Sequence, residues 1–138
     1  MTFRTTFRMT FYSFSLGALL TFLPGAAVAQ SVDFVEPKQG DTVPSTFTVR
    51  FAVEGMAVAP AGDMTAGTGH HHLLIDTADI EENVAIPMDD QHRHFGKGQT
   101  ETSITLTPGK HRLTMQFADG AHRSYGAKYR KSIEVTVK

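Results

Sequence analysis

The sequence predicts an all-β protein, an antiparallel β-sandwich of immunoglobulin-like type that follows a cleaved signal peptide. Three observations predict this class. Short segments alternate between apolar and polar residues, turn signals recur at intervals of roughly ten residues, and no long stretch has the period of an α-helix.

Residues 1–29 have the organisation of a secretory signal peptide. Arg4 and Arg8 precede an apolar run over residues 11–23, and Ala27-Val28-Ala29 is a small-x-small cleavage site. The run is shorter than the ~20 apolar residues that a membrane-spanning helix needs. We therefore expect an exported protein, periplasmic or secreted, with no stable membrane anchor.

Residues 30–138 are expected to form a single β-sandwich domain. The second expected strand has period two, which places Phe47, Val49 and Phe51 on one face. Pro108-Gly109 is a tight turn between two others. Each expected strand is a short apolar or alternating run, and in chain order they cover residues 32–36, 47–53, 71–76, 102–107, 111–117 and 132–137.

Two long segments lie between these strands and are expected to be loops. Residues 55–69 are rich in Gly, Ala and Pro, and residues 77–100 are mostly polar. Loops of such length are usually functional or disordered.

Composition excludes several classes of function. Thirteen Lys and Arg against fourteen Asp and Glu give a formal net charge of −1, which argues against a nucleic-acid-binding protein. The 41% of hydrophobic residues is too high for a disordered tail. The absence of Cys excludes disulfides, thiolate metal sites and a Cys nucleophile.

The unusual feature of the composition is histidine. Residues i and i+2 of a strand point the same way, about 6.6 Å apart. His70 and His72 therefore share one face of the expected central strand, whereas His71 faces the other side with Leu73 and Ile75. All seven histidines follow the leader: His70, His71, His72, His92, His94, His111 and His122.

His92 and His94 repeat the His-x-His spacing if their segment is extended. Two such pairs brought together offer up to four imidazole ligands for a transition metal ion. Square-planar nitrogen ligation suits Cu(II) and tetrahedral ligation suits Zn(II), and the motif alone does not choose between them. The hypothesis favours copper, and zinc is possible. The candidate metal ligands are His70, His72, His92, His94, His71 and His122.

Other side chains could support such a site. Asp76 and Asp119 are candidate acceptors that would orient a ring nitrogen. Thioethers in the loops would favour Cu(I) if they converge, and these belong to Met56, Met64 and Met88.

Two long motifs resemble a known family. The segments 67–76 (GTGHHHLLID) and 91–101 (QHRHFGKGQTE) are similar to the signature of the exported bacterial domain-of-unknown-function family 4399. The resemblance covers nearly all of residues 32–138 and implies an exported domain with these boundaries. Family sequences tend to continue after the Asp-x-x-His element with prolines and another His, whereas residues 123–129 are RSYGAKY.

The hypothesis that follows is an exported, His-rich, non-enzymatic protein of the periplasm that binds a metal ion, with copper favoured. One alternative is a cupin-like metalloenzyme, which requires His70, His72 and His111 to converge inside a barrel. A second alternative is a structural or interaction sandwich in which the histidines bind no metal. The protein partner is not predicted.

Overall fold

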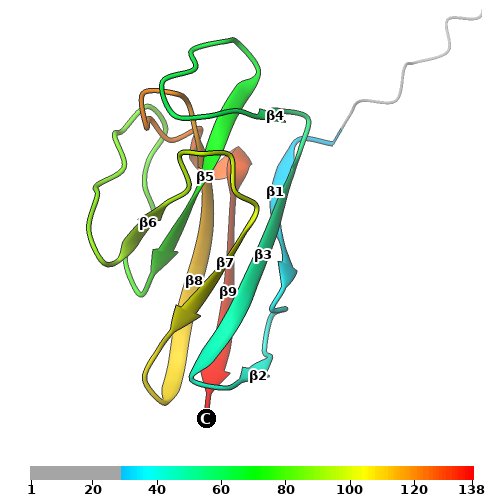
Figure 1. The fold of residues 1–138 in the computed structure, drawn as a ribbon, viewed down its shortest axis with the longest axis vertical. Coiled ribbons are helices and arrows are strands. Elements are labelled where there is room, and N and C mark those ends of the chain that lie inside the picture. The colour runs from blue at the N-terminus through cyan, green and yellow to red at the C-terminus, as the bar shows by residue number, and fades with distance from the viewer. Residues whose placement is uncertain (1–28) are drawn as a thin grey trace, which may run out of the picture.

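A computed structural model describes residues 29–138, and nearly all of the predicted signal peptide lies outside them. Two β-sheets pack face to face (Figure 1). The elements are β1 (Ser31–Glu36), β2 (Thr42–Val43), β3 (Thr46–Glu54), β4 (Ala57–Val58), β5 (Thr68–Ile75), β6 (His92–His94), β7 (Glu101–Thr105), β8 (Gly109–Ala118), the 3₁₀ helix η1 (Gly126–Tyr129) and β9 (Arg130–Val137).

The smaller sheet has the strand order β1-β3-β7, all antiparallel. Alternation in β3 buries Phe47, Val49 and Phe51 and exposes the residues between them, as the period-two pattern predicts. This sheet therefore presents one apolar face to the rest of the domain.

The larger sheet has the order β2-β9-β8-β5-β4. Strand β6 also pairs with β5, further along that strand than β4 does. Its long pairs, β5 with β8 and β8 with β9, are antiparallel, whereas the two-residue pairs β2–β9 and β4–β5 are parallel. The prediction of an all-β sandwich is confirmed.

The core lies between the two sheets. Phe34, Val49 and Phe51 from the smaller sheet meet Leu73 and Met115 from the larger one, and all are almost fully buried. Ile133, Val135 and Val137 extend the same cluster along β9. Burial of this apolar area supplies the main stabilisation of a chain that has no disulfide.

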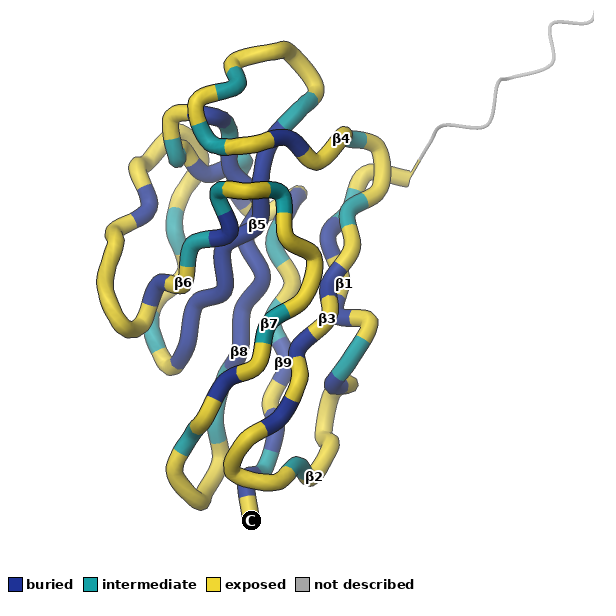
Figure 2. The backbone as a smooth tube through the Cα atoms, in the orientation of Figure 1, coloured by how far each residue is buried: buried dark blue, intermediate teal, exposed yellow. Residues whose placement is uncertain are grey.

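The central strand β5 differs from an ordinary sandwich strand because it is buried on both faces (Figure 2). One face packs into the core. The other lies beneath two connections, residues 76–91 and 119–125, which hydrogen-bond to each other through Asn83 with Ser124 and Ile86 with His122. Polar side chains on this second face are therefore removed from water.

The two predicted loops contain short strands that their sequences do not reveal. Residues 55–69 include β4, and residues 77–100 include β6. Both strands are too short for an alternating pattern, and both form by pairing with the edge of β5. Among residues 29–138, no helix is long and apolar enough to cross a membrane.

Candidate metal centre

Alternation along β5 sends its three histidines to opposite sides of the larger sheet. His71 faces the core side, as expected, and His70 and His72 face the outer side. All three side chains are fully buried. The strand therefore fixes two imidazoles side by side in a dry environment, with their ring centroids 4.8 Å apart.

Strand β6 adds the next imidazole. His94 pairs directly with His72 in the antiparallel register of β5 and β6, so the two side chains lie on the same face. The centroid of the His94 ring is 5.1 Å from that of His72 and 5.0 Å from that of His70. The two His-x-His motifs thus contribute three rings to one place.

A tight turn after β8 contributes the fourth ring, from His122. Asp119 organises this turn, because its Oδ1 accepts hydrogen bonds from the backbone N–H groups of Ala121 and Arg123. His122 has φ of +64°, a left-handed conformation that is uncommon for a residue with a side chain. The turn thereby carries the His122 ring to within 4.7 Å of the His94 ring, centroid to centroid.

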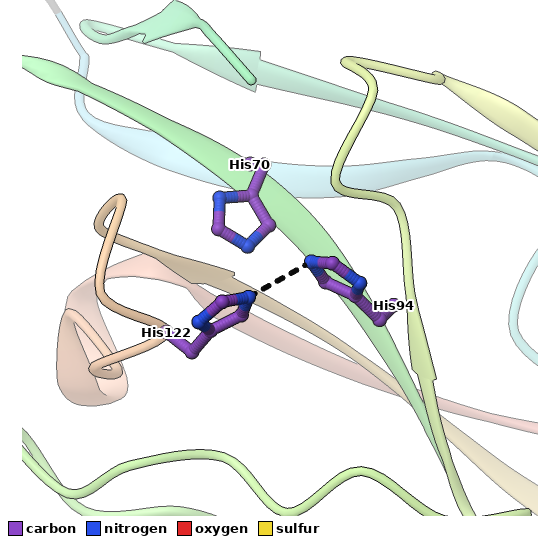
Figure 3. A group of neighbouring side chains, drawn as sticks. All are labelled: His70, His94 and His122. Atoms are coloured by element: carbon purple, nitrogen blue, oxygen red, sulfur yellow. Dashed lines mark hydrogen bonds between the residues drawn. The ribbon is translucent and has the colours of Figure 1, made fainter. Parts of the chain in front are cut away.

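The resulting four-histidine cluster consists of His70, His72, His94 and His122, and Figure 3 shows three of its members pointing toward one another. The Nε2 atoms of His94 and His122 are 3.1 Å apart. Ring nitrogens of His70, His94 and His122 all lie within 4.8 Å of one another. His72 completes the cluster, with its ring centroid 5.9 Å from that of His122.

The spacing fits a shared metal ion. A nitrogen ligand binds Zn²⁺ at about 2.0–2.1 Å, so neighbouring nitrogens around one such ion lie about 2.9–3.4 Å apart. The His94–His122 separation is within this range, and the third nitrogen of the group requires only a small ring movement. The cluster can therefore hold a transition metal ion.

Several of these nitrogens have no other partner. Both ring nitrogens of His70 and of His72 are buried without a hydrogen bond. A neutral imidazole carries one donor and one acceptor, and buried polar groups in proteins nearly always find partners, an ion included. A metal ion shared between these rings would supply the missing partner.

Burial keeps His70, His72 and His94 in the form that binds metals. It is the main cause that lowers the pKa of His70 to about 4, and the neighbouring His94 and His122 contribute to the same shift. Burial also lowers the pKa of His72 and of His94. These rings are therefore neutral near pH 7, with a lone pair available.

His71 does not join the cluster. Its ring packs in the core between Phe51, 4.7 Å away, and Phe117, 4.8 Å away, and neither ring nitrogen has a hydrogen-bond partner. Burial lowers the pKa of His71 to about 4. The structure thus places His71, a predicted ligand, on the side of the sheet opposite to the other rings.

His92 also lies outside the cluster. It pairs with Leu74, two residues along β5 from His72, the partner of His94, and its Nδ1 is 2.7 Å from Oδ1 of Asp89. The carboxylate of Asp89 thus orients the His92 ring. The second His-x-His motif consequently contributes His94 alone to the group.

His111 occupies the opposite end of β8. Its Nδ1 is 2.6 Å from Oδ2 of Asp76, and its Nε2 is 2.8 Å from the carbonyl oxygen of Thr107. The bond to Asp76 raises the pKa of His111. Asp76 therefore orients His111 and not the cluster, and the cupin-like convergence of His111 with His70 and His72 does not occur.

A covering segment, residues 60–63, is hydrogen-bonded to the backbone next to the segments that carry His94 and His122. The N–H groups of Ala61 and Gly62 donate to the carbonyl oxygens of Gly96 and Gly120. A Cβ at Gly96 would overlap the His94 ring, at 2.5 Å from its Nε2. Only glycine therefore permits this approach.

Solvent reaches the cluster from one side. His70 and His72 are fully buried, whereas His94 and His122 are half-buried. His94 also lines a surface groove of about 620 Å³ between β6 and β7. Of the predicted thioether donors, Met64 and Met88 are exposed on the surface.

Sequence reasoning did not identify two contributors to this site. Gln116 lies beside His72 in the β5–β8 register and is fully buried, and the covering segment lies in a predicted surface loop. Period-two alternation in β8 places Gln116 on the face opposite to Met115, which is the face of the sheet that carries His72. This alternation is the sequence signal that could have identified Gln116.

Comparison with known proteins gives one family. No match was found among curated proteins, and none among solved structures. The family described as "Domain of unknown function (DUF4399)" matches residues 49–138, which include every histidine of the cluster. The chain therefore belongs to this family of domains of unknown function, DUF4399.

Proposed function

We propose that this protein binds a transition metal ion, with copper as its principal ion, through the four-histidine cluster, and that it does so as an exported protein of the periplasm. The observation that carries the proposal is the convergence of His70, His94 and His122, from three separate segments, with their nitrogens within 4.8 Å of one another.

The donor set favours copper. All four candidate ligands are imidazoles, and affinity for divalent ions at nitrogen sites rises along the first-row series to a maximum at Cu²⁺. The strand partners His72 and His94 and the turn residue His122 are fixed by backbone hydrogen bonds, which preorganises the rings. Zn²⁺ is the competing ion at such a site.

A binding role is favoured over catalysis. Four protein ligands complete a tetrahedral or square-planar shell, whereas catalytic metal sites keep a position for water or substrate. His111, the residue that a cupin-like enzyme would need, is held by Asp76 and Thr107 at the far end of β8. The cluster therefore resembles a holding site.

The first experiment measures the metal that the protein carries. The full chain is expressed with its own leader, purified from the periplasmic fraction without an affinity resin, and analysed by inductively coupled plasma mass spectrometry. We expect copper in wild-type protein and its loss from the His94→Ala/His122→Ala double variant. Equal copper in both proteins, or none in either, would reject the metal site. Recovery of the protein only in the cytoplasm would reject export.

The second experiment measures affinity. Cu(II) and Zn(II) are titrated separately against a competing chelator, with wild-type protein and with the His70→Ala/His72→Ala variant. We expect a higher affinity for Cu(II) and a loss of at least tenfold in the variant. His111→Gln serves as a control, because its ring lies far from the cluster and should leave the affinity unchanged.

A further inference from the structure

Gln116 has an unusual arrangement of hydrogen bonds. Its side chain is fully buried, and its Nε2 lies 3.2 Å from the carbonyl oxygen of Phe117 and 3.1 Å from those of Gly126 and Tyr129. These three acceptors fix which end of the amide is nitrogen. The Oε1 end is consequently turned away from η1.

That oxygen has no partner. Among the described residues, 29–138, Gln116 Oε1 is the one buried side-chain oxygen without a hydrogen bond. The remaining orphaned atoms are the ring nitrogens of His70, His71 and His72. An unpaired buried acceptor costs about 1–3 kcal/mol, so its retention beside unpaired donors calls for a reason.

The sheet register places Gln116 beside His72. The two residues are directly paired in the antiparallel β5–β8 ladder, so their side chains lie on the same face with Cβ atoms about 4.5–5.5 Å apart. On its other side, His72 is paired with His94. The row across the sheet is therefore Gln116, His72, His94, with the acceptor at one end and the proposed metal site at the other.

From this arrangement we infer that Gln116 is the positioning residue of His72. The two groups are unpaired neighbours in the structure, and a turn of the His72 ring would let Oε1 accept the N–H of one ring nitrogen. The other nitrogen would then carry a lone pair toward His94 and act as the fourth metal ligand. Metal-binding histidines commonly donate their second N–H to such an acceptor, which fixes the tautomer and the ring plane. The inference rests on the proposed function for its metal step, whereas its hydrogen bond can be tested in the metal-free protein.

The first test uses metal-free wild-type protein and needs no variant. Long-range ¹H–¹⁵N spectroscopy of the full exported protein reports the tautomer of His72. We expect one tautomer, with a ring N–H that exchanges slowly with solvent. Rapid exchange of the His72 ring between its two tautomers would overturn the inference, and this result does not depend on metal binding.

The second test compares Gln116→Met with wild type. Methionine keeps the length of the side chain and removes the acceptor oxygen. We expect a mixture of His72 tautomers in the apo variant, a 10–100-fold weaker affinity for Cu(II), and an electron paramagnetic resonance spectrum with one fewer coordinated nitrogen. An unchanged spectrum and an unchanged affinity would overturn the positioning role.

Thr114→Val is the matched control. Thr114 is buried on the same face of β8, two residues from Gln116, but it pairs with Leu74 and hydrogen-bonds Ser132. The variant should lower the melting temperature and leave the His72 tautomer and the copper spectrum as in wild type. If wild-type protein binds no Cu(II), the proposed function fails, and the apo measurement still decides the role of Gln116.

Discussion

The Nε2 atoms of His94 and His122 lie 3.1 Å apart although the residues are 28 positions apart in the chain. In the metal-free protein one ring donates a hydrogen bond to the other. A metal ion would replace that shared proton, because both lone pairs then point at the same centre. This pair is therefore the most sensitive point at which to test the site.

Replacement of His94 should weaken metal binding far more than replacement of its strand neighbour His92. His94→Ala removes a ring of the cluster, whereas the His92 ring is turned toward Asp89. We expect His94→Ala to weaken Cu(II) binding by at least tenfold and His92→Ala to change it less than threefold, as measured by competitive titration (~1.4 kcal/mol per factor of ten). Equal losses would place the ion elsewhere.

The metal-free protein should lose stability in acid below about pH 6.5. The pKa of His70 and of His71 is about 4 in the folded protein, against an ordinary value of 6.5, so the unfolded chain binds more protons between these two values. Stability is therefore full above pH 6.5 and falls as the pH drops, by about 1.4 kcal/mol per pH unit for each histidine. Urea unfolding at a series of pH values measures the slope, and a flat profile would contradict the assignment.

Replacement of His71 by an apolar residue should stabilise the protein. The His71 ring has two unpaired nitrogens between Phe51 and Phe117, and an apolar side chain of similar size avoids that desolvation cost. We expect His71→Leu to raise the free energy of unfolding by about 1–2 kcal/mol, with a larger gain in acid. Copper affinity should stay the same, and its loss would show that His71 supports the site.

Gly96→Ala should disturb the cluster without removing a ligand. The new Cβ would overlap the His94 ring, and Ala61 would be its next neighbour at 3.1 Å. We expect weaker Cu(II) binding and a circular dichroism spectrum like that of wild type, which would show that the fold is retained. The double variant Gly96→Ala/Ala61→Gly removes the contact with Ala61 and keeps the overlap with the His94 ring. If this double variant binds Cu(II) as wild type does, displacement of the His94 ring is not the cause of the weaker binding.

His111→Gln should lower stability and leave metal binding intact. The Asp76 carboxylate raises the pKa of His111, so the charged pair stabilises the fold below pH 6.5 and its contribution disappears as the pH rises through that raised pKa. We expect a loss of about 1–3 kcal/mol at pH 6 and a smaller loss at pH 9. Denaturant titration at the two pH values provides the comparison.

The fold could be predicted because alternation and turn residues are local signals. The pattern of β3 and the inward direction of Leu73 and Ile75 follow from a period of two, and the structure agrees. The strands β4 and β6 could not be predicted, since each is short and exists only through pairing with β5. Their formation is a tertiary effect.

The candidate site could be predicted in part for the same reason. The shared direction of His70 and His72 is local, whereas the choice of His94 over His92 depends on the β5–β6 register. The position of the His122 ring in the cluster depends on the positive φ of His122 in its turn. A His residue rarely adopts this conformation, so the sequence does not predict it. The orientation of the Gln116 amide depends on three backbone carbonyls, two of them from the segment that follows β8.

The unequal exposure of the four rings would give metal exchange at the proposed site a direction. His94 and His122 touch solvent, and His70 and His72 do not. If the proposed site binds a metal ion, an arriving ion would meet the outer pair first and would gain the inner pair only after losing its remaining waters. Release would reverse this order, so the outer rings would be the last to hold the departing ion.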